Sequence, residues 1–354
     1  MAGNAVPFGT SSVADDLFLK YYIGKFNTAP QSSVFLYSGE VPGVFRKTVT
    51  EGKSWQFLME AWDPAAEDFD PGNEMLGQSF EEAEGTITPD KYIVAHNMIP
   101  RDEMHRSHFE VLGRRAVQHR STLSRLMDRR GFITMALAAR DTALTGARTG
   151  ATVHNGGNRV TRAGSSTTYA TALATAYPRS STGAANLVAD IRQLARQLDE
   201  DNIPDGPQNR SLVMVPALRD VLLFDTTGQL FSTDYVVDNN NNRREVKTLA
   251  GFRVLGFPNT TSGQGPLPNE NFTTGLSKYQ ANFTPGTGQG TPVVLAMCNT
   301  MDGAAAAGLV TFEDIKHEVV YIPEKLSYLV MSYTYAGWGK MHPWAAGSIE
   351  LTNN

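Results

Sequence analysis

The sequence predicts an α+β protein with one long helix and a two-stranded finger that projects from the body. Side chains alternate over 53–59 as in an extended strand, and a second extended run covers 86–99. Apolar residues recur in steps of three, four or seven across 103–144, as on one face of a long helix. Two short apolar runs, 211–215 and 251–258, have the length of buried strands. Together these signals predict the α+β class.

Length, charge and cysteine content limit the classes to consider. A chain of 354 residues exceeds the usual size of one domain, so we expect two or three subdomains. The net charge of −5 argues against nucleic-acid binding over the whole surface, because phosphate binding requires many cations. Any contact with DNA must therefore be local. Cys298 alone can form neither an intramolecular disulfide nor a multi-thiolate metal site, and its apolar neighbours predict a small buried side chain.

The start of the chain and its hydropathy predict a soluble protein. The first residues lack the basic start and continuous apolar segment of a signal peptide. No stretch approaches the roughly 20 apolar residues of a membrane-spanning helix, so no contact with a membrane is expected. Residues 1–16 are small and polar, which is typical of an arm that becomes ordered against a partner.

The segment between the two extended runs is strongly acidic. Residues 63–84 contain no Lys or Arg. The acidic residues are Asp63, Glu67, Asp68, Asp70, Glu74, Glu81, Glu82 and Glu84. We therefore predict a finger formed by 44–62 and 86–99, with an acidic tip. An isolated two-stranded hairpin is only marginally stable in water, so a neighbour is expected to cover it.

The second half of the chain mixes loops, helices and short strands. Residues 150–183 are rich in Gly, Ser, Thr and Ala and are predicted to be loop. A helix is expected over 184–199 with Thr182 as its N-cap, and Pro216 suits the first turn of another helix. Residues 258–292 form a Gly- and Pro-rich insertion, which is typical of a functional or mobile segment.

Positive charge is concentrated on the predicted long helix. Residues 101–148 contain ten Arg against five Asp and Glu, in a chain that is acidic overall. Arginines on an exposed face can neutralise phosphates without reading a base sequence. The equally weighted alternative is a solvated helix face, or arginines paired with acids of neighbours.

Few residues suggest catalytic chemistry. His105 and His108 lie three residues apart on the predicted helix, a spacing that can place two imidazoles on one metal ion. No motif supplies a third ligand, so surface histidines are the better interpretation, and neither a metal nor a cofactor is expected. The sequence also lacks a nucleophile elbow and a phosphate-binding loop. We therefore predict a protein that is not an enzyme.

The order of these segments resembles that of one family over nearly the whole chain. Arm, acidic finger, long helix and mixed domain follow one another as in the major capsid proteins of tailed double-stranded-DNA bacteriophages, which have the Hong Kong 97 fold. The short-tailed phages are the most similar group. The segments that carry this resemblance are Leu17-Phe-Leu-Lys20, Gly52-Lys-Ser-Trp-Gln-Phe57, Pro71-Gly-Asn-Glu74, Ser211-Leu-Val-Met-Val-Pro-Ala-Leu-Arg-Asp-Val-Leu-Leu223, Leu249-Ala-Gly-Phe-Arg-Val-Leu-Gly-Phe-Pro258 and Ala345-Ala-Gly347. The insertion 258–292 and the aromatic tail 333–344 depart from the family pattern.

The resemblance implies five parts and a function. The parts are an N-terminal arm (1–43), an extended loop (44–99), the spine helix of a peripheral domain (100–149), an axial domain (150–311) and C-terminal strands that return to the peripheral domain (312–354). The implied function is a major capsid protein that self-assembles into hexamers and pentamers of an icosahedral shell around a double-stranded DNA genome. The expected location is the virion, after assembly in the bacterial host cytoplasm. Implied partners are other copies of the chain, portal and scaffolding proteins, a cement or decoration protein, and packaged DNA contacted without sequence specificity.

Contact residues are predicted on the arm, the finger and the Arg-rich helix. Large aromatics carry much of the energy of protein interfaces, and acidic side chains orient a partner. Contacts between subunits are predicted for Phe18, Tyr21, Trp55, Phe57, Trp62, Asp68, Asp70, Glu74 and Glu81. Contacts with DNA are predicted for Arg114, Arg115, Arg129 and Arg130. The alternative for any one of the aromatics is packing within its own subunit.

Two other functions remain open on the sequence. An encapsulin-like compartment would have a similar architecture but would package enzymes, and the basic helix and phage-like arm favour a phage shell instead. A soluble hydrolase or metal-binding enzyme would depend on His105 and His108.

Overall fold

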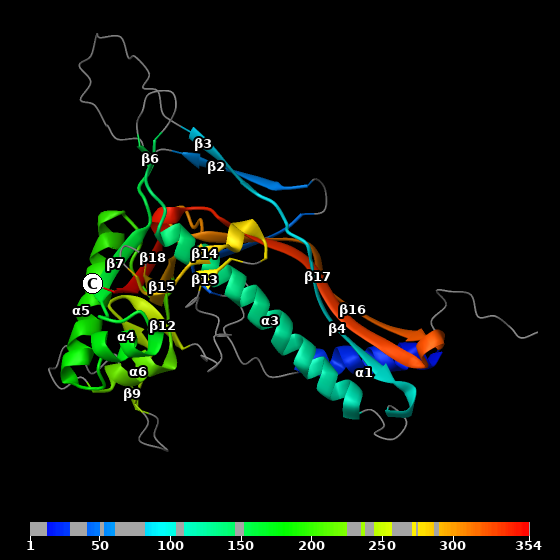
Figure 1. Ribbon diagram of the computed structural model, residues 1–354. Helices are drawn as coiled ribbons and strands as arrows, with labels where there is room; N and C mark the ends of the chain where they lie inside the picture. The colour runs from blue at the N-terminus through cyan, green and yellow to red at the C-terminus, as the bar shows by residue number, and fades with distance from the viewer. Residues whose placement is uncertain are drawn as a thin grey trace, which may run out of the picture.

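Two β-sheets and one long helix organise the structure (Figure 1). This computed structural model describes residues 13–28, 41–49, 53–60, 82–103, 110–145, 152–224, 235–237, 244–256, 271–273, 275–286 and 290–353. The helices in these residues are α1 (Val13–Thr28), α3 (Glu110–Ala139), α4 (Tyr169–Ala176), α5 (Ser181–Glu200) and α6 (Pro216–Leu222). Shorter elements are β5 (Leu144–Thr145), β6 (Thr152–His154), β9 (Tyr235–Val237), β10 (Arg244–Val246), β13 (Asn271–Phe272), β14 (Ala281–Asn282), η2 (Ser277–Tyr279), η3 (Pro323–Lys325) and η4 (Pro343–Ala345).

The first sheet has four strands in the order β1-β16-β17-β4. Their bounds are β1 (Val44–Thr48), β16 (Ala307–Ile322), β17 (Ser327–Lys340) and β4 (Tyr92–Pro100). Strands β16 and β17 form a long antiparallel hairpin, β1 runs parallel to β16, and β4 is antiparallel to β17. Helices α1 and α3 cover one face of this sheet (Figure 1). Here Ile93, Ala95 and Ile99 of β4 join the same buried core as Leu112 and Ala116 of α3.

The second sheet has six strands in the order β11-β12-β8-β15-β18-β7. Their bounds are β11 (Thr248–Leu249), β12 (Phe252–Gly256), β8 (Arg210–Met214), β15 (Thr291–Cys298), β18 (Ala346–Thr352) and β7 (Asn158–Ala163). Strands β8, β15 and β18 are buried along their whole length, because helices and loops cover both of their faces. Helix α5 buries Leu187, Ile191, Leu194 and Leu198, which recur at helical spacing and form one apolar face.

Helix α3 joins the two sheets, and a buried ion-pair group fixes its C-terminal end. The helix contacts β4, β16 and β17 of the first sheet and β15 and β18 of the second. Arg140, directly after the helix, donates from Nε to Glu350 Oε1 at 2.7 Å and from Nη1 to the carbonyl of Asn282 at 3.0 Å. Arg159 of β7 pairs with the other oxygen of Glu350 at 2.7 Å. The Glu350 side chain is fully buried, so its ion pairs with these two arginines compensate for the hydration that the carboxylate loses.

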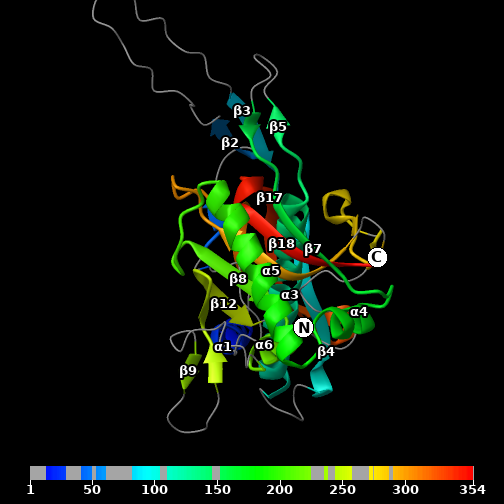
Figure 2. The same ribbon diagram turned by 90° about the vertical axis from the view of Figure 1, so that its left-hand side faces the viewer.

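The finger is present as an antiparallel pair of strands, β2 (Trp55–Glu60) and β3 (Glu82–Ile87). Both views show this pair at the end of the molecule away from α4 and α6 (Figures 1 and 2). The predicted two-stranded finger is therefore confirmed, but it is shorter than expected. The outer parts of the two extended runs, β1 and β4, pair with β16 and β17 instead.

Two local predictions are wrong, one for a tertiary reason and one for a capping reason. Residues 150–183 are not a loop throughout, because β7 pairs in parallel with β18, a partner that a local pattern does not reveal. Helix α5 takes Ser180 as its N-cap rather than Thr182, and the Ser180 hydroxyl accepts from the Gly183 amide. The last strand, β18, lies in the six-stranded sheet, whereas β17 pairs with β4 and packs on α3. The division of the chain into five parts, with 312–354 returning to the peripheral domain, stays a prediction. The predicted strands at 211–215 and 251–258 and the helix that starts at Pro216 are confirmed.

Helix α1 is held on the body by a buried polar network. The hydroxyl of Tyr22 lies 2.6 Å from His119 Nδ1 on α3 and 2.6 Å from the Ser332 hydroxyl on β17. Ser332 is in turn 2.9 Å from His317 Nδ1. Burial raises the pKa of Tyr22 to about 12, so its phenol keeps its proton. Burial, followed by the charge of Arg115 and the nearby His96 and His317, lowers the pKa of His119 to about 4.

The first prediction concerns the buried ion-pair group. Replacing Glu350 by Gln keeps the shape of the side chain but leaves the half-buried Arg140 and Arg159 without their anion. Removing one partner of a fully buried pair costs about 3–5 kcal/mol. Because water reaches both arginines in part, urea unfolding of the unassembled chain should show a loss of about 2–3 kcal/mol. The matched control is Arg196→Gln, whose pair with Glu200 is exposed and should contribute less than about 0.5 kcal/mol. Equal losses in the two variants would contradict a special role for Glu350.

The second prediction concerns pH. The pKa of His119 is lower in the folded chain (about 4) than its ordinary value of 6.5, so between these values the unfolded chain binds more protons. The contribution of His119 to the free energy of unfolding is therefore fully present above pH 6.5 and is lost as the pH falls toward 4. It amounts to about 2 to 3 kcal/mol, to be measured as the difference in unfolding free energy between pH 7.5 and pH 4.5. In the variant His119→Gln, the unfolding free energy should change less between these two pH values. If it changes as much as in the parent chain, groups other than His119 cause the pH dependence.

Candidate subunit-contact surfaces

The base of the finger packs against its own body. The ring of Trp55 stacks on Phe45 with 5.2 Å between centroids and lies 5.3 Å from Phe57. Phe57 crosses over Gly85, its partner in β3, where an added Cβ would come within 2.2 Å of the ring. Phe57 also contacts His342 edge to face at 6.2 Å. Glycine at position 85 thus allows the aromatic ring to clamp the hairpin.

The structure places the predicted contact residues of the finger and the arm differently. Trp55 and Phe57 are half-buried at the finger base, as are Phe18 and Tyr21 on α1. Phe18 meets Tyr328 edge to face at 5.7 Å. All four therefore have partners in their own chain, and their contact with a neighbouring subunit stays a prediction. The tip residues Trp62, Asp68, Asp70, Glu74 and Glu81 lie outside the described residues.

The face of the four-stranded sheet opposite α1 and α3 carries an exposed apolar stripe. Strand residues alternate between faces, so the neighbours of buried Ile93 and Ala95 point away from the helices. The stripe consists of the exposed Tyr92, Val94, Met98 and Val320 and the half-buried Leu329, Met331, Tyr333 and Tyr335. Tyr92 stacks on Tyr335 at 4.8 Å, and Tyr92 is 54% exposed.

Polar contacts order this stripe without covering it. Tyr333 donates to Glu318 Oε1 at 2.7 Å, and this hydrogen bond, followed by burial, raises the Tyr333 pKa to about 12. The Lys316 ammonium pairs with Glu313 at 2.9 Å and lowers the pKa of that carboxyl. An exposed apolar patch of this length is typical of a protein–protein contact. No local pattern in the sequence predicts this stripe, because it runs across strands that are distant in the chain.

The four arginines predicted to contact DNA fall into two groups. Arg129 lies over the ring of Phe272 at 4.4 Å, and Arg130 lies over Tyr279 at 5.3 Å. Arg130 is also 3.7 Å from Asp90, which accepts a hydrogen bond from the Tyr279 hydroxyl at 2.6 Å. Burial raises the pKa of Tyr279 strongly, so this phenol stays a donor. Arg129 and Arg130 therefore hold the η2 region on α3, as in the alternative interpretation of the Arg-rich helix.

The other two arginines face outward to different extents. Arg114 is exposed, and Arg115 is half-buried and donates to Gln118 Oε1 at 2.9 Å. Contact with DNA stays a prediction for all four arginines. One apolar position of the predicted helix, Leu126, is 38% exposed, so the buried stripe of α3 is narrower than the sequence suggests.

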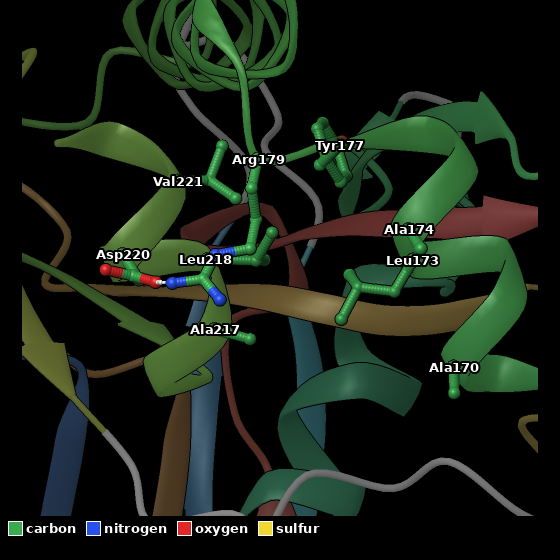
Figure 3. Close-up of a pocket in the computed structure, with 9 residues that line it drawn as sticks. All are labelled: Ala170, Leu173, Ala174, Tyr177, Arg179, Ala217, Leu218, Asp220 and Val221. Atoms are coloured by element: carbon green, nitrogen blue, oxygen red, sulfur yellow. Dashed lines mark hydrogen bonds and ion pairs between the residues drawn. The ribbon is translucent and has the colours of Figure 1, made fainter. Parts of the chain in front are cut away.

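A small apolar pocket lies between α4 and α6 (Figure 3). It has a volume of about 190 Å³, and Leu173 from α4 and Leu218 and Val221 from α6 contribute its walls. Arg179 and Asp220 form an ion pair at its edge. The lining phenol, Tyr177, is engaged with Asp190 at 2.7 Å. The pocket thus offers an apolar shape and carries no nucleophile placed beside a base.

Metal and thiol chemistry find little support in the described part of the chain. No group of three or more His, Cys, Asp or Glu side chains lies close enough there to hold a metal ion. His105 and His108 lie outside the described residues. Cys298 is buried in β15 as predicted, and burial raises its thiol pKa to about 12. Among the described helices, none is long and apolar enough to cross a membrane.

Comparisons with known proteins point to one family. A comparison with curated protein sequences gives no match. Among solved structures, the capsid of the cyanophage P-SCSP1u aligns with a TM-score of 0.70 at 22% identity, covering 98% of this chain and 96% of that one. The mature capsid of bacteriophage PhiM1 aligns with a TM-score of 0.61 at 17% identity over 88% and 86% of the two chains. The capsid of the Helicobacter pylori bacteriophage KHP30 aligns with a TM-score of 0.57 at 12% identity over 99% and 100%.

These alignments at low identity show a shared fold, and a family model adds the sequence relationship. The model described as Gp10A-like major capsid protein matches residues 60–350, well over half of the chain. The finger, the long α3 and the two sheets are thus the parts of a capsid subunit, and the chain belongs to the Gp10A-like family of major capsid proteins, with the Hong Kong 97 fold.

Proposed function

We propose that copies of this capsid protein assemble into hexamers and pentamers that close an icosahedral shell around the double-stranded DNA of a tailed phage. The observation that carries the proposal is the finger. Within the described residues, β2 and β3 pair only with each other, while every strand of the two large sheets has its partners in the body. A two-stranded hairpin cannot bury enough apolar surface by itself, so its outer part needs a neighbouring subunit.

The surfaces of the subunit support repeated contacts of two kinds. The apolar stripe of the four-stranded sheet can be desolvated by a neighbour, which favours association through burial. The acidic segment 63–84 supplies negative charge for orientation and salt sensitivity more than for affinity. Each contact can be weak, because many copies in a closed lattice reinforce one another.

The partners and the place of assembly belong to the same proposal. Portal and scaffolding proteins, a cement or decoration protein and assembly in the bacterial cytoplasm are supported by family membership alone. The family and the fold are those of structural capsid proteins rather than enzymes. The match to a capsid family also favours a phage shell over an encapsulin-like compartment or a metal-binding hydrolase.

The third prediction tests the finger. Glu60 and Glu82 are the outermost pair of the described hairpin, so residues 61–81 can be replaced by an Asn-Gly turn without disturbing β2 or β3. The shortened chain should fold with an unchanged urea midpoint but should form no closed shells under conditions where the parent does, as seen by electron microscopy. Shell formation by the shortened chain at the parent's yield would contradict the role of the finger.

A matched variant separates the charge of the tip from its length. In this variant the eight acidic residues of 63–84 are replaced by Gln or Asn, and the length of the chain is unchanged. If charge only orients the finger, shells should still form, and their yield should no longer fall when salt is raised from about 50 to 500 mM, because the screened attraction is gone. Loss of all shells in this variant would show that the acids supply affinity.

A further inference from the structure

Helices α1 and α3 share an exposed surface whose described charges have one sign. The exposed charged side chains described on these two helices are Lys20, Lys25, Arg114 and Arg125. The one carboxylate among the described side chains of the two helices, Asp128, is fully buried. Asp15, Asp16 and Glu110 lie in the first turns, with side chains outside the description. Over their full lengths the two helices contain eight Lys and Arg against four Asp and Glu. An acidic chain thus has a cationic face here, which we define by the four exposed cations.

The half-buried arginines of α3 hold this cationic face together. Arg120 donates to the carbonyls of Phe26 and Asn27 at the end of α1, each at 2.5 Å. These carbonyls have no partners within the helix, and a cation also suits the negative end of the helix dipole. Arg120 therefore fixes α1 beside α3. The exposed cations of the two helices then belong to one rigid surface.

The spacing of the cations suits an extended polyanion. Arg114 and Arg125 are separated by about 16 Å along α3, at a rise of about 1.5 Å per residue. One DNA strand carries a phosphate about every 3.4 Å, so several phosphates lie within this span. Lys25 and Arg114 also line a hollow of about 450 Å³ between the helices, together with Tyr21, Val117 and Gln118.

We propose that the cationic face of α1 and α3 binds the phosphate backbone of the packaged double-stranded DNA without reading its sequence. This inference rests on the proposed shell function. It assigns the contact to the four exposed cations, Lys20, Lys25, Arg114 and Arg125. Arg129 and Arg130 are left out, because their side chains are half-buried and their guanidinium groups lie over Phe272 and Tyr279.

Charge and surface chemistry favour DNA over an acidic protein segment. The apolar stripe that suits a protein partner lies on the opposite face of the same sheet, beside Glu313, Lys316 and Glu318. The face with the apolar groups is therefore separate from the cationic face. A protein with a net charge of −5 repels DNA over most of its surface. Cations gathered on the cationic face reverse this repulsion locally.

The fourth prediction tests the cationic face in the full-length chain. A variant with Lys20, Lys25, Arg114 and Arg125 replaced by Gln should bind a 40-base-pair duplex of random sequence at least ten-fold more weakly at about 50 mM salt. The slope of log affinity against log salt should become shallower by about 0.9 for each phosphate that the variant no longer neutralises. Titration of a labelled duplex against the unassembled protein measures both. Unchanged affinity would overturn the proposal.

Three controls keep the outcomes distinct. A variant with the exposed cations Lys47, Lys91, Lys247 and Arg253 replaced by Gln removes the same charge elsewhere and should lose less than two-fold in affinity. A variant with Arg114→Lys and Arg125→Lys keeps the charge and should keep the affinity for the duplex. A loss of affinity as large as that of the Gln variant would show that the shape of the side chains, rather than their charge, is involved. A labelled peptide of residues 63–84 tests the acidic finger as the ligand: if only peptide binding falls in the Gln variant, the face docks protein and the DNA assignment is wrong.

Electron microscopy of the same variants separates this inference from the proposed function. The Gln variant should form empty shells as the parent does while it binds DNA poorly. Failure of the parent chain to form shells would instead count against the shell function itself.

Discussion

The position of α3 against both sheets is the constraint on which the rest of the subunit depends. Its buried side chains enter the core of the four-stranded sheet, and Arg140 at its end is fixed to the buried Glu350 of the six-stranded sheet. Because a buried carboxylate is stable only when it is paired, this group tolerates little displacement of the helix. Helix α1 is positioned in turn by α3, through His119 and Arg120. One long helix therefore sets the arrangement of both sheets and of the arm.

This arrangement gives the subunit two unlike sides. The helix-covered side of the four-stranded sheet carries exposed Lys and Arg, and the other side carries Tyr, Val, Met and Leu. A shell subunit has to hold its neighbours and enclose a polyanion, and these two tasks call for apolar and cationic surfaces respectively. The finger adds a third element, a hairpin whose base is clamped by Phe57 over Gly85. Because its base is fixed to the body and its strands project from it, the hairpin is suited to contact a neighbouring subunit.

The candidate surfaces were only partly predictable. The paired strands of the finger and the buried Cys298 follow from local patterns, and the structure confirms them. The sequence does not predict which arginines of α3 are exposed and which pack against other side chains, since Arg114 and Arg129 are of the same residue type on the same helix. Arg129 lies over Phe272, a residue far along the chain, whereas Arg114 is exposed, so the surroundings of the two side chains differ. The apolar stripe was missed for a similar reason: Tyr92 and Tyr335 meet only through strand pairing.

The sequence by itself determined the long helix, the finger, the short buried strands and the helix that starts at Pro216, because helical and strand periodicity and turn residues act over a few positions. It also carried the family resemblance. Only the tertiary structure decided that 158–163 is a strand, that β18 joins the six-stranded sheet and that Glu350 is buried between two arginines. These features depend on partners about 190 to 210 residues away. Once the local helices and strands have formed, their apolar faces and strand edges pair with elements far along the chain. A local stretch of sequence does not contain those partners, so it cannot predict the pairing.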